Sequence, residues 1–357
     1  MAYTELKASD PMAIIQHLLV DEFGSFVGKH SERVQVTKKD SVLTQAPLIH
    51  LETITIANQG VSLSAEMVRE CAERGIPIFF VSGTGTAYAS LYSAGLTGTV
   101  LTRRAQLQAF TNGLGWQFAC SAAAGKIHNQ AQLLKYMGKY RKSNQPELFA
   151  VLQNEIEEIN AQTASIAALQ RRAQSEEDPL QTCRDQLMGI EGYAAQRYWS
   201  AVGKVIPPEL GWSGRIGRGA TDPFNSALNY GYGILYGQIE RALVLAGLDP
   251  FAGFLHVDRP GKPSLTLDMI EEFRQAVVDR TVIGMVNKGV ELVMEDGLLS
   301  KSTRRTLAEK VLARLDTAVR YEQKQFPLRH ILQSQARKLA QFVRGENPTY
   351  VPFSADW

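Results

Sequence analysis

The sequence has too few cysteines for a disulfide-bonded or zinc-bound scaffold. Only 3 cysteines occur among 357 residues, at positions 71, 120 and 183, and no two of them form a CxxC pair. An odd number of widely spaced cysteines argues against a disulfide framework and against a structural zinc site. Free thiols suit a reducing compartment, so we expect a cytoplasmic protein.

Long apolar segments are also missing from the sequence. No run approaches the ~18 apolar residues that a membrane-spanning helix needs. Residues 1–11 carry neither the basic start nor the apolar stretch of a secretory leader. We therefore expect a soluble, unexported chain that makes no membrane contact.

Motifs that bind nucleotide phosphates are absent or incomplete. The sequence has no GxxxxGK[ST] phosphate loop, and Gly83-Thr-Gly85 lacks the third glycine of a dinucleotide fingerprint. We interpret Gly83-Thr-Gly85 as a turn between two strands. The histidines at positions 17, 30, 50, 128 and 330 form no i, i+4 pair of the kind that binds zinc on one helix face.

Charge is nearly balanced overall but is unevenly distributed. The formal net charge is +2, yet residues 101–142 hold seven basic and no acidic side chains, and residues 301–344 hold eleven basic against three acidic. Residues 261–300 instead hold seven acidic against four basic side chains. Basic segments around an acidic centre suit an enzyme that grips a phosphate backbone and binds a metal. The solvated faces of long helices would give the same pattern, so charge alone leaves both interpretations open.

The amino-terminal part of the chain, up to about Tyr92, is typical of short strands. Alternation such as Val34-Gln-Val36 and Ile54-Thr-Ile56 is the period-two pattern of half-buried strands. Ser64 could cap a helix that runs to Arg74 and is closed by Gly75. We predict strands over residues 16–20, 25–28, 33–37, 48–56 and 76–82.

The remainder of the chain is typical of helices. We predict helices over 148–169, 187–202, 226–246, 269–286 and 303–319, with breaks at 207–208, 211–219 and 261–263, where Gly and Pro cluster. The predicted fold class is α+β, with several domains. A small β-rich domain spans 1–94, small residues and glycines form a linker over 95–100, and a large all-α domain spans 101–357.

One histidine lies close in sequence to a cluster of acids. Gly253-Phe-Leu-His256 is followed by Asp268, Glu271 and Glu272, whose i, i+3 and i+4 spacing places them on one face of a helix. Crowded negative charge of this kind favours a bound cation. By sequence alone, a partly buried histidine that bonds a carbonyl group is the plainer interpretation of His256.

Another acid stands between two glycines. Glu191 lies in Gly189-Ile-Glu191-Gly192, where the glycines weaken a helix unless another element or a ligand approaches closely. A lone Glu in such a position is more typical of the surface than of a catalytic site. Both interpretations stay open from composition and spacing.

These segments carry a family resemblance. The sequence resembles the CRISPR-associated endonuclease and integrase of spacer acquisition, the first-numbered Cas protein family, over nearly its whole length. The segments that carry this resemblance occur in the same order as in that family and span residues 74–82, 102–106, 189–199, 222–232, 247–256 and 264–274.

The resemblance implies a set of site residues. By position, Glu191, His256 and Glu271 match the family's metal ligands. Asp268 becomes a nearby catalytic acid that binds or orients the metal's water or a second ion, and Glu272 is assigned to solvent. The residues that we expect to bind DNA or phosphate are Arg103, Arg104, Arg218 and Asn225.

The resemblance also implies a reaction and partners. One imidazole with carboxylates suits Mg²⁺ or Mn²⁺ better than Zn²⁺, and these ions support phosphoryl transfer. The implied activity is a transesterification that inserts 3′-hydroxyl ends of prespacer DNA into the CRISPR repeat array, with nuclease activity on DNA. The implied partners are double-stranded DNA, a second copy of the chain in a homodimer, and the small second-numbered Cas protein.

Two other functions remain open at this point. A non-catalytic DNA-binding scaffold would use a metal for structure only. A metal-dependent hydrolase of small phosphoesters would have no use for the basic segments.

Overall fold

The computed structural model describes residues 15–39, 41–85, 87–92, 100–139, 141–217 and 219–356. The chain divides into two compact units, Met1–Leu96 and Thr97–Trp357. Residues 95–99 of the predicted linker lie outside the described residues, and Val100 already belongs to the first helix of the second unit.

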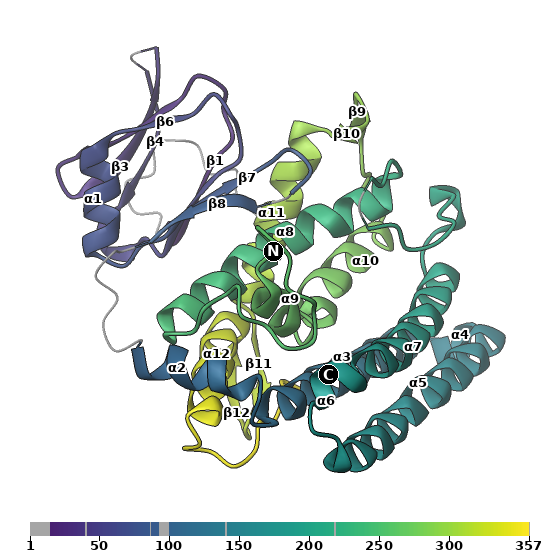
Figure 1. The fold of residues 1–357 in the computed structure, drawn as a ribbon. Coiled ribbons are helices and arrows are strands. Elements are labelled where there is room, and N and C mark those ends of the chain that lie inside the picture. Colours follow the sequence, from purple (N-terminus) through teal and green to yellow (C-terminus); the bar gives the residue numbers. More distant parts are fainter. Residues whose placement is uncertain are drawn as a thin grey trace. The chain divides into compact units, whose positions relative to one another are not determined.

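Among its described residues, the first unit holds two four-stranded sheets and one helix (Figure 1). One sheet has the order β1-β5-β7-β8, in which only β8 is antiparallel to its neighbour. The other has the order β4-β3-β2-β6, in which only β6 pairs in parallel. The strands are β1 His17–Val20, β2 Phe26–His30, β3 Arg33–Lys38, β4 Ser41–Pro47, β5 Thr53–Ile56, β6 Ser62–Leu63, β7 Ile78–Val81 and β8 Ala87–Leu91.

The helix α1 (Ala65–Glu73) of this unit begins and ends where the local sequence predicts. The Ser64 hydroxyl accepts a hydrogen bond from the Met67 amide at 3.1 Å, and Gly75 follows the helix with a φ of +67°. Met67 and Cys71 bury their side chains in one core with apolar residues of both sheets. The prediction of a β-rich amino-terminal region is confirmed.

The strands of the first unit differ from the predicted strands in several places. Strands β4, β6 and β8 were not predicted, and the single strand expected over 48–56 is a 3₁₀ turn, Leu48–His50, followed by β5. Residues 83–85 form the expected turn, between β7 and β8.

The second unit is mostly helical, which confirms the predicted helical character, but it also holds two short hairpins that the predicted all-α domain did not include. Helices α3, α5 and α7 pack against one another, and α8 contacts α9, α11 and α12. The helices are α2 Val100–Ala109, α3 Leu114–Gly138, α4 Arg141–Asn144, α5 Pro146–Arg172, α6 Pro179–Thr182, α7 Arg184–Val205, α8 Pro223–Leu245, α9 Ser264–Ile270, α10 Arg280–Val286, α11 Lys301–Leu315 and α12 Leu328–Val343. Single 3₁₀ turns occur at Ala173–Ser175 and Pro208–Leu210.

Two predicted helices of this unit end early. The helix expected over 269–286 is divided: α9 ends at Ile270, a π-helix spans Gln275–Asp279, and α10 follows. The helix expected to reach residue 319 ends at Leu315, before a hairpin. The short strands of this unit are β9 Met294–Glu295, β10 Leu298–Leu299, β11 Ala318–Tyr321 and β12 Lys324–Pro327.

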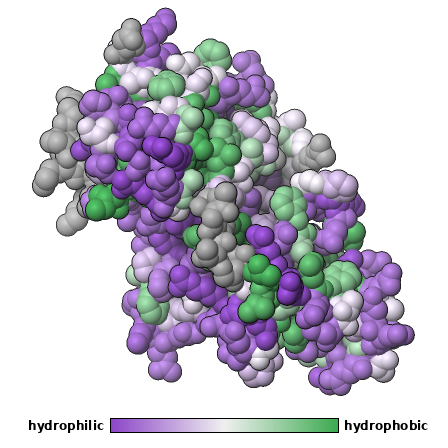
Figure 2. Space-filling view, turned by 60° about the vertical axis from the view of Figure 1, so that its left-hand side comes forward, coloured by the Kyte–Doolittle hydropathy of each residue, from purple (hydrophilic) through white to green (hydrophobic). Residues whose placement is uncertain are grey.

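The surface in Figure 2 is largely hydrophilic, with hydrophobic side chains in small groups. Within the described part of the chain, no helix has the length and apolarity needed to cross a membrane.

Candidate metal centre

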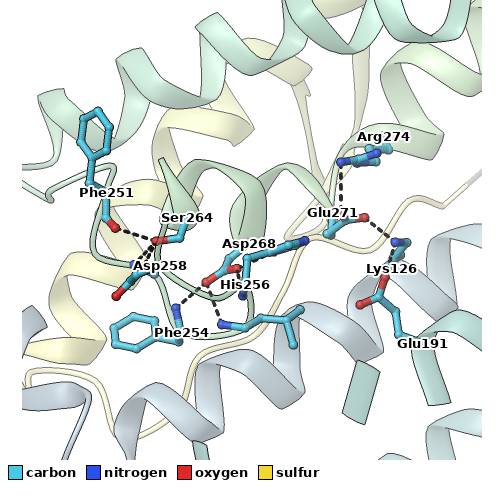
Figure 3. Close-up of polar contacts among 12 residues, drawn as sticks. Lys126, Glu191, Phe251, Phe254, His256, Asp258, Ser264, Asp268, Glu271 and Arg274 are labelled. Atoms are coloured by element: carbon cyan, nitrogen blue, oxygen red, sulfur yellow. Dashed lines mark hydrogen bonds and ion pairs between the residues drawn. The ribbon is translucent and has the colours of Figure 1, made fainter. Parts of the chain in front are cut away.

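Three elements of the second unit meet at one lysine (Figure 3). Lys126 lies in the middle of α3, Glu191 in α7 and Glu271 directly after α9. Lys126 Nζ donates a hydrogen bond to Glu191 Oε1 and lies 2.7 Å from Glu271 Oε2. These three side chains are 12%, 8% and 3% exposed. Two acids far apart in sequence therefore share one nearly buried cation.

The charges at this centre stabilise one another against burial. Burial alone would raise the pKa of Glu271, but the nearby Arg274, Lys126 and His256 lower it to about 2. Burial alone would lower the pKa of Lys126, but Glu271 and Glu191 raise it. Glu271 is thus held as a carboxylate and Lys126 as an ammonium group.

His256 is held in place by Asp268. The carboxylate of Asp268 accepts hydrogen bonds from the backbone amides of Phe254, Leu255 and His256, at 2.6, 2.9 and 2.8 Å. His256 Nδ1 lies 2.8 Å from the same carboxylate. Because Nδ1 is taken up by Asp268, Nε2 is the ring nitrogen that can bind a metal. Figure 3 shows the imidazole extending toward Glu271.

The loop that carries His256 packs tightly on the start of α9. A Cβ on Gly253 would lie 2.5 Å from the backbone carbon of Ser264, so only glycine fits there. The Ser264 hydroxyl accepts from the Gly253 amide at 2.9 Å and lies 2.6 Å from the Phe251 carbonyl oxygen. These contacts explain why glycine and serine accompany the histidine in the sequence.

The residues at this centre fit a divalent cation. Glu191 Oε2 is buried and has no hydrogen-bond partner among the described residues. Two carboxylates and one imidazole are donors that Mg²⁺ and Mn²⁺ accept. As arranged, no three His, Cys, Asp or Glu side chains in the described ranges form a ready ligand group. Lys126 Nζ lies between the two acids, so an ion bound by both would take its position.

Comparison with known proteins places the chain in a family. The model of the family described as "CRISPR associated protein Cas1" matches residues 18–312. The chain belongs to the Cas1 family. The resemblance noted in the sequence is thereby confirmed.

Two curated Cas1 relatives match along nearly their whole length. The "CRISPR-associated endonuclease Cas1 1" of Archaeoglobus fulgidus is 33% identical over 95% of this chain and 99% of its own length. The protein of the same name from Francisella tularensis subsp. novicida is 34% identical over 96% of this chain and 100% of its own length.

Solved structures share the fold. A casposase bound to its integration product matches with a TM-score of 0.75 at 20% identity, covering 94% of this chain and 93% of that one. A Cas1 protein from Thermotoga maritima matches with a TM-score of 0.70 at 19% identity, over 95% and 100%. A Cas6-RT-Cas1–Cas2 complex matches with a TM-score of 0.72 at 22% identity, over 99% of this chain and 37% of that one. The α+β fold class is therefore that of Cas1.

The residues expected to bind DNA or phosphate do not share one environment as the expected metal ligands do. Arg103 and Arg104 are exposed on α2. Arg218 lies outside the described residues. Asn225 is 0% exposed: its side chain accepts from the Ile216 amide at 3.0 Å and donates to the Gly214 carbonyl at 2.8 Å. In this arrangement Asn225 builds the 214–216 loop and does not face solvent.

The position of Glu272 differs from the prediction that this residue faces solvent. It was expected in solvent but is 0% exposed, because α9 ends at Ile270 and Glu272, in the turn that follows, packs against the carboxyl-terminal segment. It accepts hydrogen bonds from the Tyr350 hydroxyl at 2.7 Å, the Phe353 amide at 2.8 Å and the Gln335 side chain at 3.1 Å. Burial raises the pKa of Glu272 to about 7, against the effect of these hydrogen bonds.

Sequence reasoning missed two cations at the centre. Lys126 was counted with the basic segment expected on the surface, and Arg274 was given no role. Arg274 Nη2 lies 3.1 Å from Glu271 Oε1. A signal was present for Lys126, because it is one charge within a run of small and apolar residues, Ser121-Ala-Ala-Ala-Gly-Lys126-Ile. Such a run is typical of a buried helix, where a charge needs a partner.

Proposed function

We propose that this chain is a CRISPR adaptation integrase and DNA endonuclease that depends on Mg²⁺ or Mn²⁺. The observation that carries the proposal is the convergence of two buried carboxylates, Glu191 and Glu271, on one cation position, with His256 directed toward it. Membership of the Cas1 family, whose relatives bear the name endonuclease, supports nuclease chemistry.

The proposed reaction exchanges one phosphodiester bond for another. The 3′-hydroxyl oxygen of the prespacer forms a bond to a phosphorus of the repeat strand, and the bond from that phosphorus to its former 3′-oxygen breaks. The attacking hydroxyl loses a proton and the leaving oxygen gains one, so no oxidant or external energy source is needed. With water as the attacking group, the same exchange is hydrolysis.

The side chains of the metal centre have different roles. Glu191, His256 and Glu271 would hold the ion, and a bound divalent ion would supply Lewis-acid stabilisation of charge at the reacting phosphate. Asp268 fixes the ring of His256 through Nδ1 and keeps Nε2 turned to the acids. No side chain is required to form a covalent intermediate.

Double-stranded DNA, a homodimer and the small second-numbered Cas protein complete the proposal. A structural neighbour is titled as a Cas1–Cas2 complex and another as a casposase bound to its integration product. The exposed Arg103 and Arg104 on α2 supply positive charge for a phosphate backbone. We therefore infer that the basic segments of the second unit bind DNA.

A strand-joining assay tests the proposal. The protein and the small Cas partner are incubated with labelled prespacer, Mn²⁺ and a plasmid that carries a repeat array. We expect labelled DNA joined covalently at repeat borders, joining lost in His256→Ala, and joining retained in His330→Ala, which removes an exposed histidine of the same unit. DNA binding should survive both changes. Equal joining by both variants would instead indicate a scaffold, and binding insensitive to salt would point to a small phosphoester substrate.

A further inference from the structure

Arg274 and Arg215 both lie against one aromatic ring beside the metal centre. The guanidinium carbon of Arg274 is 4.7 Å from the centroid of the Tyr232 ring, and that of Arg215 is 5.4 Å from it. Cations stacked on an aromatic face are held in a fixed plane. Tyr232 is therefore a platform that orients guanidinium groups next to Glu271.

A buried carboxylate fixes this platform. Asp279, at the end of the π-helix, is 0% exposed and accepts hydrogen bonds from the Tyr232 hydroxyl and, at 2.8 Å, from the Tyr198 hydroxyl. Tyr198 is itself 0% exposed. Because the hydroxyl of Tyr232 is held at its far end, its ring has little freedom to turn.

The two arginines differ in how many donors remain available. Arg215 donates to Asn229 Oδ1 at 2.6 Å, to Asn225 Oδ1 at 3.2 Å and to the Ile216 carbonyl. These bonds commit Arg215 to the loop that carries it. Arg215 therefore has a structural role beside the metal centre.

Arg274 keeps most of its donors. A guanidinium group has five N–H donors, and within the described ranges the ion pair of Arg274 is the one from Nη2 to Glu271 Oε1 at 3.1 Å. Its Nε is buried and has no hydrogen-bond partner among the described residues. A rigid, partly satisfied guanidinium beside a catalytic centre suits a planar pair of acceptor oxygens, such as those of a phosphodiester.

We propose that Arg274 is a further catalytic residue, whose guanidinium contacts the non-bridging oxygens of the phosphodiester that reacts at this centre. Tyr232 acts as a positioning residue through its stacked ring. The unused N–H groups would stabilise the negative charge that grows on the phosphate oxygens during the exchange. This inference rests on the proposed function.

A binding experiment with an altered phosphate tests the contact. The probe is a branched DNA that mimics the joined product, with either an ordinary phosphodiester or an uncharged methylphosphonate at the junction, and binding is measured without divalent ions at fixed salt. For the wild type, we expect the methylphosphonate to weaken binding by roughly 10-fold or more, as for the loss of a charge-assisted hydrogen-bond pair. Arg274→Ala should bind the ordinary junction as weakly and should no longer distinguish the two DNAs.

Two variants separate contact from structure. Arg274→Lys keeps the charge but not the planar fork, so it should lose most of the discrimination. Tyr232→Phe keeps the ring but not the bond to Asp279, so it should lose only part of it. Mn²⁺ affinity should stay equal or become tighter in Arg274→Ala, because a positive charge beside Glu271 is gone, whereas a misfolded centre would bind Mn²⁺ more weakly.

The outcomes are distinguishable from failure of the proposed function. If the wild type joins DNA but Arg274→Ala still discriminates between the two junctions, the role of Arg274 is wrong and the integrase proposal stands. If wild-type binding is indifferent to the methylphosphonate, the contact is likewise refuted. A wild type that joins no DNA under any of these conditions refutes the proposed function itself.

Discussion

Replacing Glu272 by Gln should change how the stability of the helical unit depends on pH. Glu272 is buried against the carboxyl-terminal segment and its pKa is about 7, above the ordinary value of 4.5. The folded state therefore binds more protons than the unfolded state between these two pH values. The stability that protonated Glu272 contributes is complete below pH 4.5 and is lost as pH rises through 7.

The magnitude follows from the two pKa values. One pKa unit corresponds to about 1.4 kcal/mol, so raising the pKa from 4.5 to about 7 makes the folded state lose roughly 3 kcal/mol by pH 8. Gln cannot ionise and loses nothing over this range. The free energy of unfolding of Glu272→Gln minus that of the wild type should therefore rise by roughly 3 kcal/mol from pH 4.5 to pH 8. Glu271, with its pKa near 2, titrates below this window.

Urea unfolding followed by tryptophan fluorescence measures this difference. All 4 tryptophans, at positions 116, 199, 212 and 357, belong to the second unit, so the signal reports on the unit that contains Glu272. Glu309→Gln is the matched control, because Glu309 is a 63% exposed glutamate on α11. Its difference from the wild type should stay flat with pH. A flat difference for Glu272→Gln as well would refute the assignment of a protonated, buried Glu272.

Three further outcomes are expected. In calorimetry, Lys126→Met should bind Mn²⁺ about 10-fold more tightly than the wild type and should gain more thermal stability from the ion, because an ammonium group no longer competes for the two acids. The control Lys135→Met, which changes an exposed lysine of the same helix, should match the wild type. Weaker Mn²⁺ binding by Lys126→Met would contradict this competition. Asp268→Asn should weaken Mn²⁺ binding by about 10–100-fold in the same titration, because the imidazole loses the group that orients it, and unchanged affinity would count against that role. Burial raises the pKa of the thiols of Cys71 and Cys120 to about 12, so neither thiol should react with an aromatic disulfide at pH 8 in the folded protein. Rapid labelling of either cysteine, detected by mass spectrometry, would contradict their burial.

Local signals in the sequence were enough for some elements and not for others. Helix α1 was predictable because Ser64 and Gly75 mark its ends by capping chemistry that depends on neighbouring residues alone. Strand β4 was missed because it is an edge strand whose side chains are mostly half-buried or exposed, so it lacks an alternating apolar pattern. Helix α3 shows little periodicity because it is buried on most of its circumference.

The candidate metal centre likewise shows that local sequence signals do not determine tertiary contacts. Regular helical spacing placed Asp268, Glu271 and Glu272 on one face, but the helix ends at Ile270 and the acids diverge: Asp268 turns to His256, Glu271 to Lys126, and Glu272 to the carboxyl-terminal segment. Each partner comes from a distant part of the chain. Residue types and order were enough to name ligand candidates, whereas the division of labour among them depends on tertiary contacts.

The most direct measurement of the central claim is the magnetic coupling between bound Mn²⁺ and imidazole nitrogen. In protein labelled with ¹⁵N-histidine, electron–nuclear double resonance should detect one coupled nitrogen in the wild type and in His330→Ala, and none in His256→Ala. When the variants Glu191→Gln and Glu271→Gln are labelled in the same way, each should bind Mn²⁺ more weakly than the wild type. Tight Mn²⁺ binding without any coupled histidine nitrogen, or with coupling that survives in His256→Ala, would show that the ion binds elsewhere and would contradict the account.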